Sequence, residues 1–152
     1  MLALVGSIAP THANAQVDPV VIATRWIDAA RTGDAKQLSA LSALPMTVQD
    51  VTNNDGSVSR CVPLKVTSRA AVEHGLRVWK AMFVGTPTWQ RTDAGTDWFE
   101  CPARGARRRT VIASKPGDIA VTFELGGTQV TVRVSKGGKV VAVTRLAYDG
   151  GE

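Results

Sequence analysis

The sequence is poor in the residue types that most often carry out chemistry. Its 152 residues include two histidines, two cysteines and one tyrosine, and aromatic residues make up 5% of the chain. His74 has no second metal ligand at a useful spacing, which predicts a surface role and no metal site. The sequence also has no Gly-x-Ser-x-Gly nucleophile motif and no phosphate-binding glycine loop. We therefore expect no cofactor.

Long hydrophobic runs are absent as well. The apolar run over residues 2–9 is too short to cross a bilayer, and no other segment is long and apolar enough, so we expect no membrane span. Ala13-Asn14-Ala15 fits the small-x-small pattern of a secretory cleavage site, although no Lys or Arg precedes the run. We expect residues 1–15 to be a signal peptide, truncated or atypical, and residues 16–152 to form one domain. The protein would then be exported to the periplasm or the extracellular space. The alternative is a disordered N-terminal tail.

The chain carries a positive net charge, part of which is concentrated in one segment. The net charge is +5, and four arginines gather in residues 102–109, namely Arg104, Arg107, Arg108 and Arg109. No aromatic residue is interleaved with them, so the segment is read as a solvated loop or a contact for an acidic partner, and nucleic acid is not expected.

Export makes Cys61 and Cys101 candidates for a disulfide bond. Two buried thiols are the alternative, because a sequence does not give the Cα separation.

The first half of the chain predicts three helices and a hairpin. Apolar residues recur at helical spacing in residues 17–32, with Asp18 as N-cap, Pro19 in the first turn and Gly33 as the stop. Further helices are predicted over residues 35–43 and 69–83, with Asp34 and Ser68 as caps. Alternation predicts strands over residues 46–52 and 58–66. Residues 85–95 are predicted as a loop, and residues 96–101 and 110–113 as short strands.

Residues 119–146 predict three antiparallel strands joined by two glycine turns. A two-residue turn at Gly126-Gly127 sets Phe123 opposite Val130 and Val121 opposite Val132, with all four on one face. A second two-residue turn at Gly137-Gly138 would place Val143 opposite Val132 and Arg145 opposite Val130. A three-residue loop there would send Arg145 to the opposite face. The order of helices, hairpin, helix and meander predicts an α+β fold.

The chain resembles the nuclear transport factor 2-like superfamily, which includes SnoaL-type cyclases and ketosteroid isomerases. The resemblance lies in the element order and in the pattern Trp26…Gly33-Asp34…Leu41…Pro45, followed by Gly138-Lys139-Val140-Val141. It implies a curved antiparallel sheet that three helices from the first half of the chain close into a cone with an internal pocket. It also implies that members commonly dimerise, so a homodimer is one possibility.

The catalytic pattern of the ketosteroid isomerases is only partly present. In those enzymes a tyrosine and a protonated aspartic acid stabilise an oxyanion, and an aspartate is the base. By counting from Gly33-Asp34 and from Gly138, these positions fall on Trp26, Val130 and Asp50. Valine has no donor, so the oxyanion site would be incomplete. Asp50 alternates with apolar residues and should point inward. It would act there either as a general base or as the partner of an arginine. Arg145 is the arginine best placed for this pairing.

Three functions follow from this reading. The first is an exported domain that binds an apolar or weakly anionic small ligand, or a protein partner, without catalysis. The second is a cofactor-free isomerase, dehydratase or cyclase with Asp50 as general base. The third is a protein-interaction or dimerisation module. The residues expected to line the pocket are Trp26, Val48, Asp50, Trp79, Trp98, Phe123, Val130, Val132, Val143 and Arg145.

Overall fold

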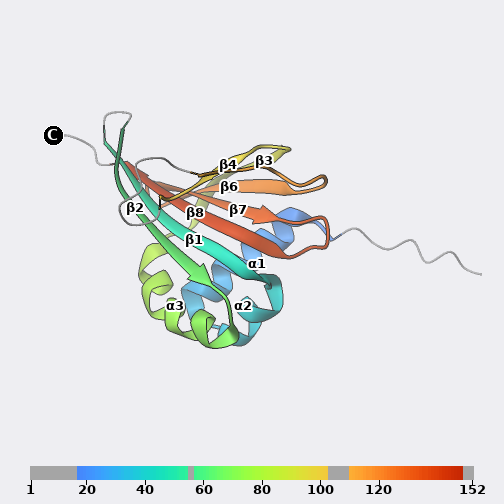
Figure 1. Ribbon diagram of the computed structural model, residues 1–152. Coiled ribbons are helices and arrows are strands. Elements are labelled where there is room, and N and C mark those ends of the chain that lie inside the picture. Colours follow the sequence, from blue (N-terminus) through green and yellow to red (C-terminus); the bar gives the residue numbers. More distant parts are fainter. Residues whose placement is uncertain (1–16, 55–56, 103–109, 149–152) are drawn as a thin grey trace, which may run out of the picture.

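A computed structural model describes residues 17–54, 57–102 and 110–148. It contains three helices, a six-stranded sheet and a separate two-stranded ribbon (Figure 1). In chain order the elements are α1 (Pro19–Thr32), α2 (Ala35–Leu41), β1 (Ser42–Asn54), β2 (Ser57–Val66), α3 (Arg69–Met82), β3 (Pro87–Ala94), β4 (Trp98–Glu100), β5 (Thr110–Ile112), β6 (Ile119–Leu125), β7 (Thr128–Val134) and β8 (Val140–Tyr148). The α+β class is therefore confirmed. The expected signal peptide lies outside the described residues.

The helices begin at the residues that the sequence indicates. The carboxylate of Asp18 accepts a hydrogen bond from the backbone N–H of Val20, and that of Asp34 accepts one from Gln37, both at 2.9 Å. The Ser68 hydroxyl caps α3 in the same way. Each cap satisfies an N–H that the first helical turn leaves unpaired. Gly33 ends α1 with a φ of 81°, a conformation that glycine adopts without steric cost.

The sheet has the strand order β2-β1-β8-β7-β6-β3, with the helices on one face (Figure 1). Its strand pairs are antiparallel except β1–β8, which is parallel, so the expected all-antiparallel sheet is a mixed one. The long connection through α3 and the meander allows this pair, because parallel neighbours need a crossover. We call the face that packs against the helices the inner face and the opposite face the outer face.

The two predicted glycine turns have different outcomes. The β6–β7 hairpin has the expected register, with Phe123 opposite Val130, and its Gly126 and Gly127 both have positive φ angles. The turn between β7 and β8 is one residue longer than predicted, because Ser135 pairs with Lys139 through a 2.8 Å hydrogen bond.

A β-bulge compensates for the longer turn. Val134 pairs with Val140, but Arg133 pairs with Ala142, so Val141 is the extra residue of β8. Beyond the bulge Arg145 lies opposite Val130, in the register first expected. The prediction of the turn was wrong, yet its consequence for Arg145 holds. The extra residue in the turn shifts the register by one position, and the extra residue Val141 in the bulge shifts it back.

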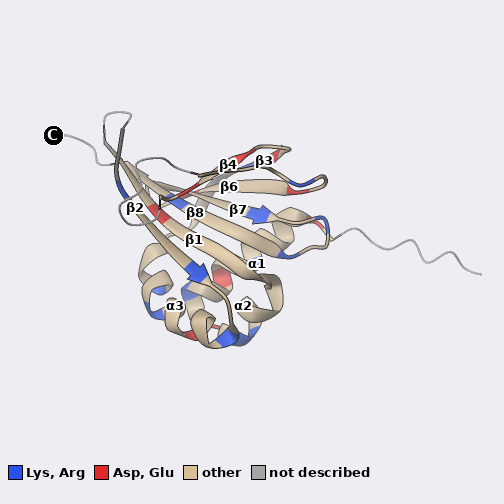
Figure 2. Cartoon of the chain, viewed as in Figure 1, with Lys and Arg blue, Asp and Glu red and all other residues tan. Residues whose placement is uncertain are grey.

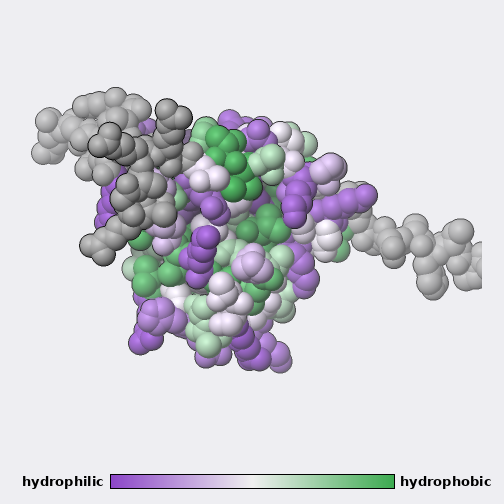
Figure 3. All heavy atoms as spheres, viewed as in Figure 1, coloured by the Kyte–Doolittle hydropathy of each residue, from purple (hydrophilic) through white to green (hydrophobic). Residues whose placement is uncertain are grey.

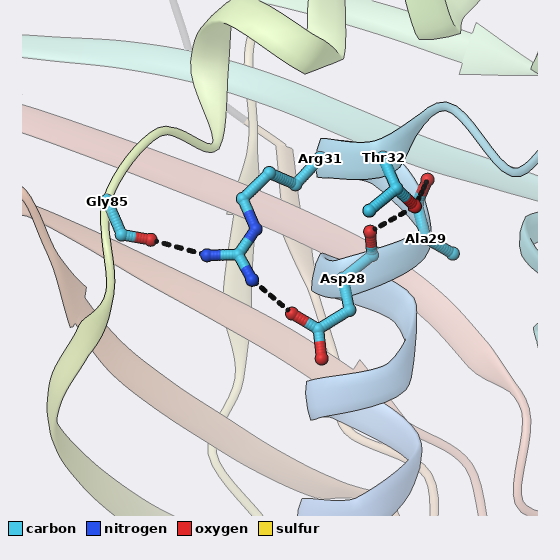
Figure 4. Close-up of polar contacts among 5 residues, drawn as sticks. All are labelled: Asp28, Ala29, Arg31, Thr32 and Gly85. Carbon is cyan, nitrogen blue, oxygen red and sulfur yellow. Dashed lines mark hydrogen bonds and ion pairs between the residues drawn. The ribbon is translucent and has the colours of Figure 1, made fainter.

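The predicted loop over residues 85–95 contains a strand, β3, which pairs with β6 at the edge of the sheet. Gln90, Arg91 and Thr92 are all exposed, so the strand has no apolar alternation to reveal it. The turn before it is held to α1 by Arg31, which donates to the carbonyl of Gly85 at 2.9 Å and to Asp28 at 2.8 Å (Figure 4).

Large aromatic side chains occupy the space between the helices and the inner face. Trp26, Trp79, Phe83 and Phe123 are at most 2% exposed, and the ring of Trp26 lies 5.7 Å from that of Trp79. A Cβ atom at Gly75 would lie 2.5 Å from the Trp79 ring, so α3 has a glycine where the indole packs across it. This space, which is the base of the cone, is therefore filled by side chains.

Candidate functional site

Asp50 and Arg145 meet on the inner face of the sheet. They are direct neighbours in the parallel β1–β8 register, and Arg145 Nη1 donates to Asp50 Oδ1 at 2.8 Å. Figure 2 shows this acidic segment of β1 beside the basic segment of β8. The side chains are 19% and 22% exposed, so the pair is shielded but still reached by water. Arg145 Nε is buried without a partner among the described residues.

A cleft of about 200 Å³ lies next to this pair, between β2 and α3. Val48, Leu64, Trp79 and Met82 give it apolar walls, and Asp50 and Arg60 give it a polar end. Hydrophobic surface is visible where β2 passes over α3 (Figure 3). Val62 and Val78, both exposed, also line the cleft, which is open to solvent. We call this the inner cleft.

The predicted pocket residues separate into three groups. Val48, Asp50 and Trp79 line the inner cleft, with Arg145 bound to Asp50. Five others are packed in the core and are not among the cleft residues, namely Trp26, Phe123, Val130, Val132 and Val143. Trp98 lies over the outer face, against Arg133. Its prediction as a lip of the inner pocket is therefore wrong, because β4 crosses the opposite side of the sheet.

Sequence reasoning missed the wall of the cleft that β2 and α3 provide. Val62 and Leu64 pair with Asp50 and Val48, so they share the face of those residues. Their alternation along β2 is a visible signal, but Pro63 between them indicated only an irregular edge strand. Val78 and Met82 lie one helical turn apart on α3, a spacing that fits packing against the same wall.

The isomerase positions do not form an oxyanion site. The indole N–H of Trp26 donates to the Ser42 hydroxyl at 3.0 Å, and that hydroxyl donates to the Leu38 carbonyl at 2.7 Å. Val130 lies opposite Arg145 and has no donor to offer. Of the three positions, one holds an indole that is already engaged, one a carboxylate that is already paired and one an apolar side chain.

The outer face has a site that the sequence did not predict. Strands β4 and β5, here called the arm, lie across it, and Gln49 is hydrogen-bonded to the backbone of β4 and of Cys101 next to it. The Gln49 amide nitrogen donates to the carbonyl of Phe99 and to the Thr144 hydroxyl, and its oxygen accepts from the backbone N–H of Cys101 at 2.9 Å. The predicted Cys61–Cys101 disulfide is present, with Cα atoms 5.4 Å apart, and it ties the arm to β2.

A groove of about 300 Å³ lies between the arm and the outer face. Its lining includes Gln49, Trp98, Thr131, Arg133, Thr144 and Leu146, together with the disulfide. Arg133 is only 6% exposed, and burial lowers the pKa of its guanidinium while Asp118 and Asp97 act in the opposite direction. We call this the outer groove.

His74 is exposed on α3 beside Arg77. Within the described ranges, no helix has the length and hydrophobicity to cross a membrane, and acidic, cysteine and histidine side chains do not gather in metal-binding groups. Arg104, Arg107, Arg108 and Arg109 lie outside the described residues.

Comparisons with known proteins find similar solved structures but no matching family model or curated sequence. No family model matches the chain, and no curated protein matches it. Among solved structures, an NTF2-like protein of unknown function from Pseudomonas putida is 13% identical, with coverage of 87% of this chain and 85% of that one and a TM-score of 0.44. A Mycobacterium tuberculosis protein in complex with estradiol-17β-hemisuccinate is 15% identical, with coverage of 84% and 91% and a TM-score of 0.39. An NTF2-like protein from Burkholderia xenovorans is 14% identical, with coverage of 84% and 86% and a TM-score of 0.37. At such identities and TM-scores the likeness gives no information about activity.

Proposed function

We propose that this protein is an exported, non-catalytic domain that binds a small apolar molecule with a polar or weakly anionic end in the inner cleft. The observation that carries the proposal is the Asp50–Arg145 ion pair at 2.8 Å. Asp50 is the candidate base, and its carboxylate is already engaged by a guanidinium. The oxyanion donors that would accompany a base are missing at the Trp26 and Val130 positions.

The polar end of the cleft sets the expected charge of the ligand. Asp50 contributes one negative charge there, whereas Arg60 and Arg145 contribute two positive charges. A weakly anionic or neutral polar group is therefore favoured over a cation. The apolar walls of Val48, Leu64 and Met82 would cover the rest of the molecule.

The size of the cleft selects a slender ligand. Pockets for drug-sized molecules usually have volumes of roughly 300–1,000 Å³. The inner cleft has about 200 Å³, because aromatic side chains fill the base of the cone. We expect a short aliphatic chain or a single ring.

The filled cone base also favours the second candidate, an interaction module. Val62 and Val78 are 42% and 54% exposed where the cleft opens, and a partner segment with one apolar anchor could cover both. A homodimer formed face to face through the sheet is less favoured, because the arm covers part of the outer face.

Calorimetric titration with octanoate, octanol and octylammonium tests the small-ligand proposal on the wild-type protein. These probes share one chain and differ in the charge of the end group. We expect octanoate to bind most tightly and octylammonium least, with a difference of roughly tenfold for a net positive site near solvent. Equal affinities, or tightest binding of octylammonium, would contradict the proposed polar end.

Two matched tryptophan variants locate the binding site. Val78→Trp should obstruct the cleft and abolish binding, whereas Val21→Trp introduces the same side chain at an exposed valine of α1 that does not line the cleft. If both variants bind octanoate like the wild type, the inner cleft is not the site. The export part is tested separately by N-terminal sequencing, which should begin near Gln16, and an intact Met1 in a cytoplasmic fraction would contradict it.

A further inference from the structure

Arg133 is a buried cation with no ion pair among the described residues, and the charges of Asp118 and Asp97 act on it only from a longer distance. Its Nη2 donates to the carbonyl of Asp97 at 3.3 Å, and its guanidinium lies 5.6 Å from the Trp98 ring centroid. Among the described residues, no carboxylate lies within ion-pair distance of it. A buried charge without a counter-ion in contact is costly, and a guanidinium has five N–H donors, of which the bond to Asp97 uses one.

One hydroxyl group, that of Thr144, extends this donor set along the floor of the outer groove, whereas the Thr131 hydroxyl is hydrogen-bonded with that of Thr122. Thr131 and Thr144 are direct neighbours across β7 and β8, and Arg133 is two residues from Thr131 on the same face, about 7 Å along the strand. The Thr144 hydroxyl accepts from Gln49, so its own proton is left for an acceptor. Arg133 and Thr144 therefore both present donors to the groove.

The remaining surfaces of the groove are apolar. Trp98 and Leu146 line it, and the Cys61–Cys101 disulfide forms part of its wall. A volume of about 300 Å³ is at the lower end of the usual range for small-molecule pockets. One cationic site with a single adjoining hydroxyl suits a carboxylate, and the apolar wall suits a flat hydrocarbon body.

We propose that the outer groove is a binding site for a small aromatic carboxylate, whose anionic group is held by Arg133 and Thr144 and whose ring lies against Trp98 and Leu146. This site is separate from the inner cleft, on the opposite face of the sheet. The proposal stands whether or not the inner cleft binds a ligand.

The test compares 2-naphthoate with 2-naphthalenemethanol, which keeps the ring system and removes the charge. In calorimetry, wild-type protein should bind the carboxylate roughly tenfold or more tightly, as a charge-assisted hydrogen bond predicts. In nitrogen-resolved NMR spectra, the carboxylate should shift the indole signal of Trp98 and leave that of Trp79 unchanged. Absence of binding, equal binding of both probes, or a shift of Trp79 in place of Trp98 would each overturn the proposal.

Charge-matched variants then identify the residues. Arg133→Met should remove the preference for the carboxylate, whereas Arg69→Met removes an equal charge from an exposed position on α3 and should retain it. Thr144→Val should weaken naphthoate binding about threefold, in line with a lost hydroxyl hydrogen bond, and it serves as the readout if Arg133→Met does not fold. An unchanged preference in Arg133→Met would show that Arg133 only anchors the arm, and unchanged affinity in Thr144→Val would contradict the proposed place of the carboxylate. Val78→Trp should leave naphthoate binding intact, which separates this site from the inner cleft.

Discussion

The two faces of the six-stranded sheet are built from alternate residues of the same strands, yet they are held in different ways. The inner face presents valines and Phe123 to three helices. The outer face contains four of the five buried polar or charged residues of the described chain, namely Thr47, Gln49, Thr122 and Arg133. Apolar area can be covered by any well-packed helix, whereas buried polar groups need partners at fixed positions. Residues 97–101, in and beside the arm, supply the partners of Thr47, Gln49 and Arg133, Thr131 is the partner of Thr122, and a disulfide ties the arm to β2.

The largest effect is expected from the inner face. Phe123→Ala removes a ring that is 2% exposed and should lower the free energy of unfolding by about 4 kcal/mol, the usual cost of this change in a core. Urea denaturation measures it. Phe99→Ala on the arm is the matched control, since Phe99 is 53% exposed and its loss should cost under about 0.5 kcal/mol. Similar losses in the two variants would remove the distinction between the faces.

The second effect concerns the covalent link of the outer face. Replacing Cys61 and Cys101 together by serine should lower the free energy of unfolding by about 3–4 kcal/mol, as the chain-entropy model gives for a separation of 40 residues. Hydrogen exchange at residues 98–100 should also speed up, while that of β6 in the core should change less. An unchanged denaturation midpoint would mean that the bridge adds nothing to the contacts of Gln49.

The third effect isolates the hydrogen bonds of the arm from its disulfide. Gln49→Leu keeps the size of the side chain and removes three hydrogen bonds, leaving the backbone N–H of Cys101 without its partner. We expect a loss of about 2 kcal/mol, measured in urea with the disulfide intact. Gln90→Leu, on the exposed edge strand β3, is the control and should have little effect. A neutral Gln49→Leu would show that the disulfide and the bonds of Thr47 and Arg133 hold the arm without Gln49.

The same contrast explains what the sequence could predict. Period-two alternation identified the inner face and the β6–β7 register, because burial acts on every second residue. It missed β3, whose exposed edge has no such pattern, and it missed the outer groove entirely. Gln49 is hydrogen-bonded to Phe99 and Cys101, about 50 positions away in the sequence, and no local sequence pattern indicates such partners. Arg145 reached its predicted face through a bulge at Val141 that cancelled a wrongly predicted turn.

The smallest effect is expected at the ion pair of the inner face, and it decides between binding and catalysis. A double-mutant cycle with Asp50→Asn and Arg145→Met should give a coupling of about 1 kcal/mol in unfolding free energy. The geometry is good, but water reaches both side chains, which are about one fifth exposed. The exposed Arg69–Glu73 pair of α3, at 3.7 Å, should give a coupling nearer 0.3 kcal/mol. A coupling of zero for Asp50 and Arg145 would mean that the guanidinium does not hold the carboxylate. Asp50 would then be free to act as a base, and the enzyme hypothesis would gain over the binding proposal.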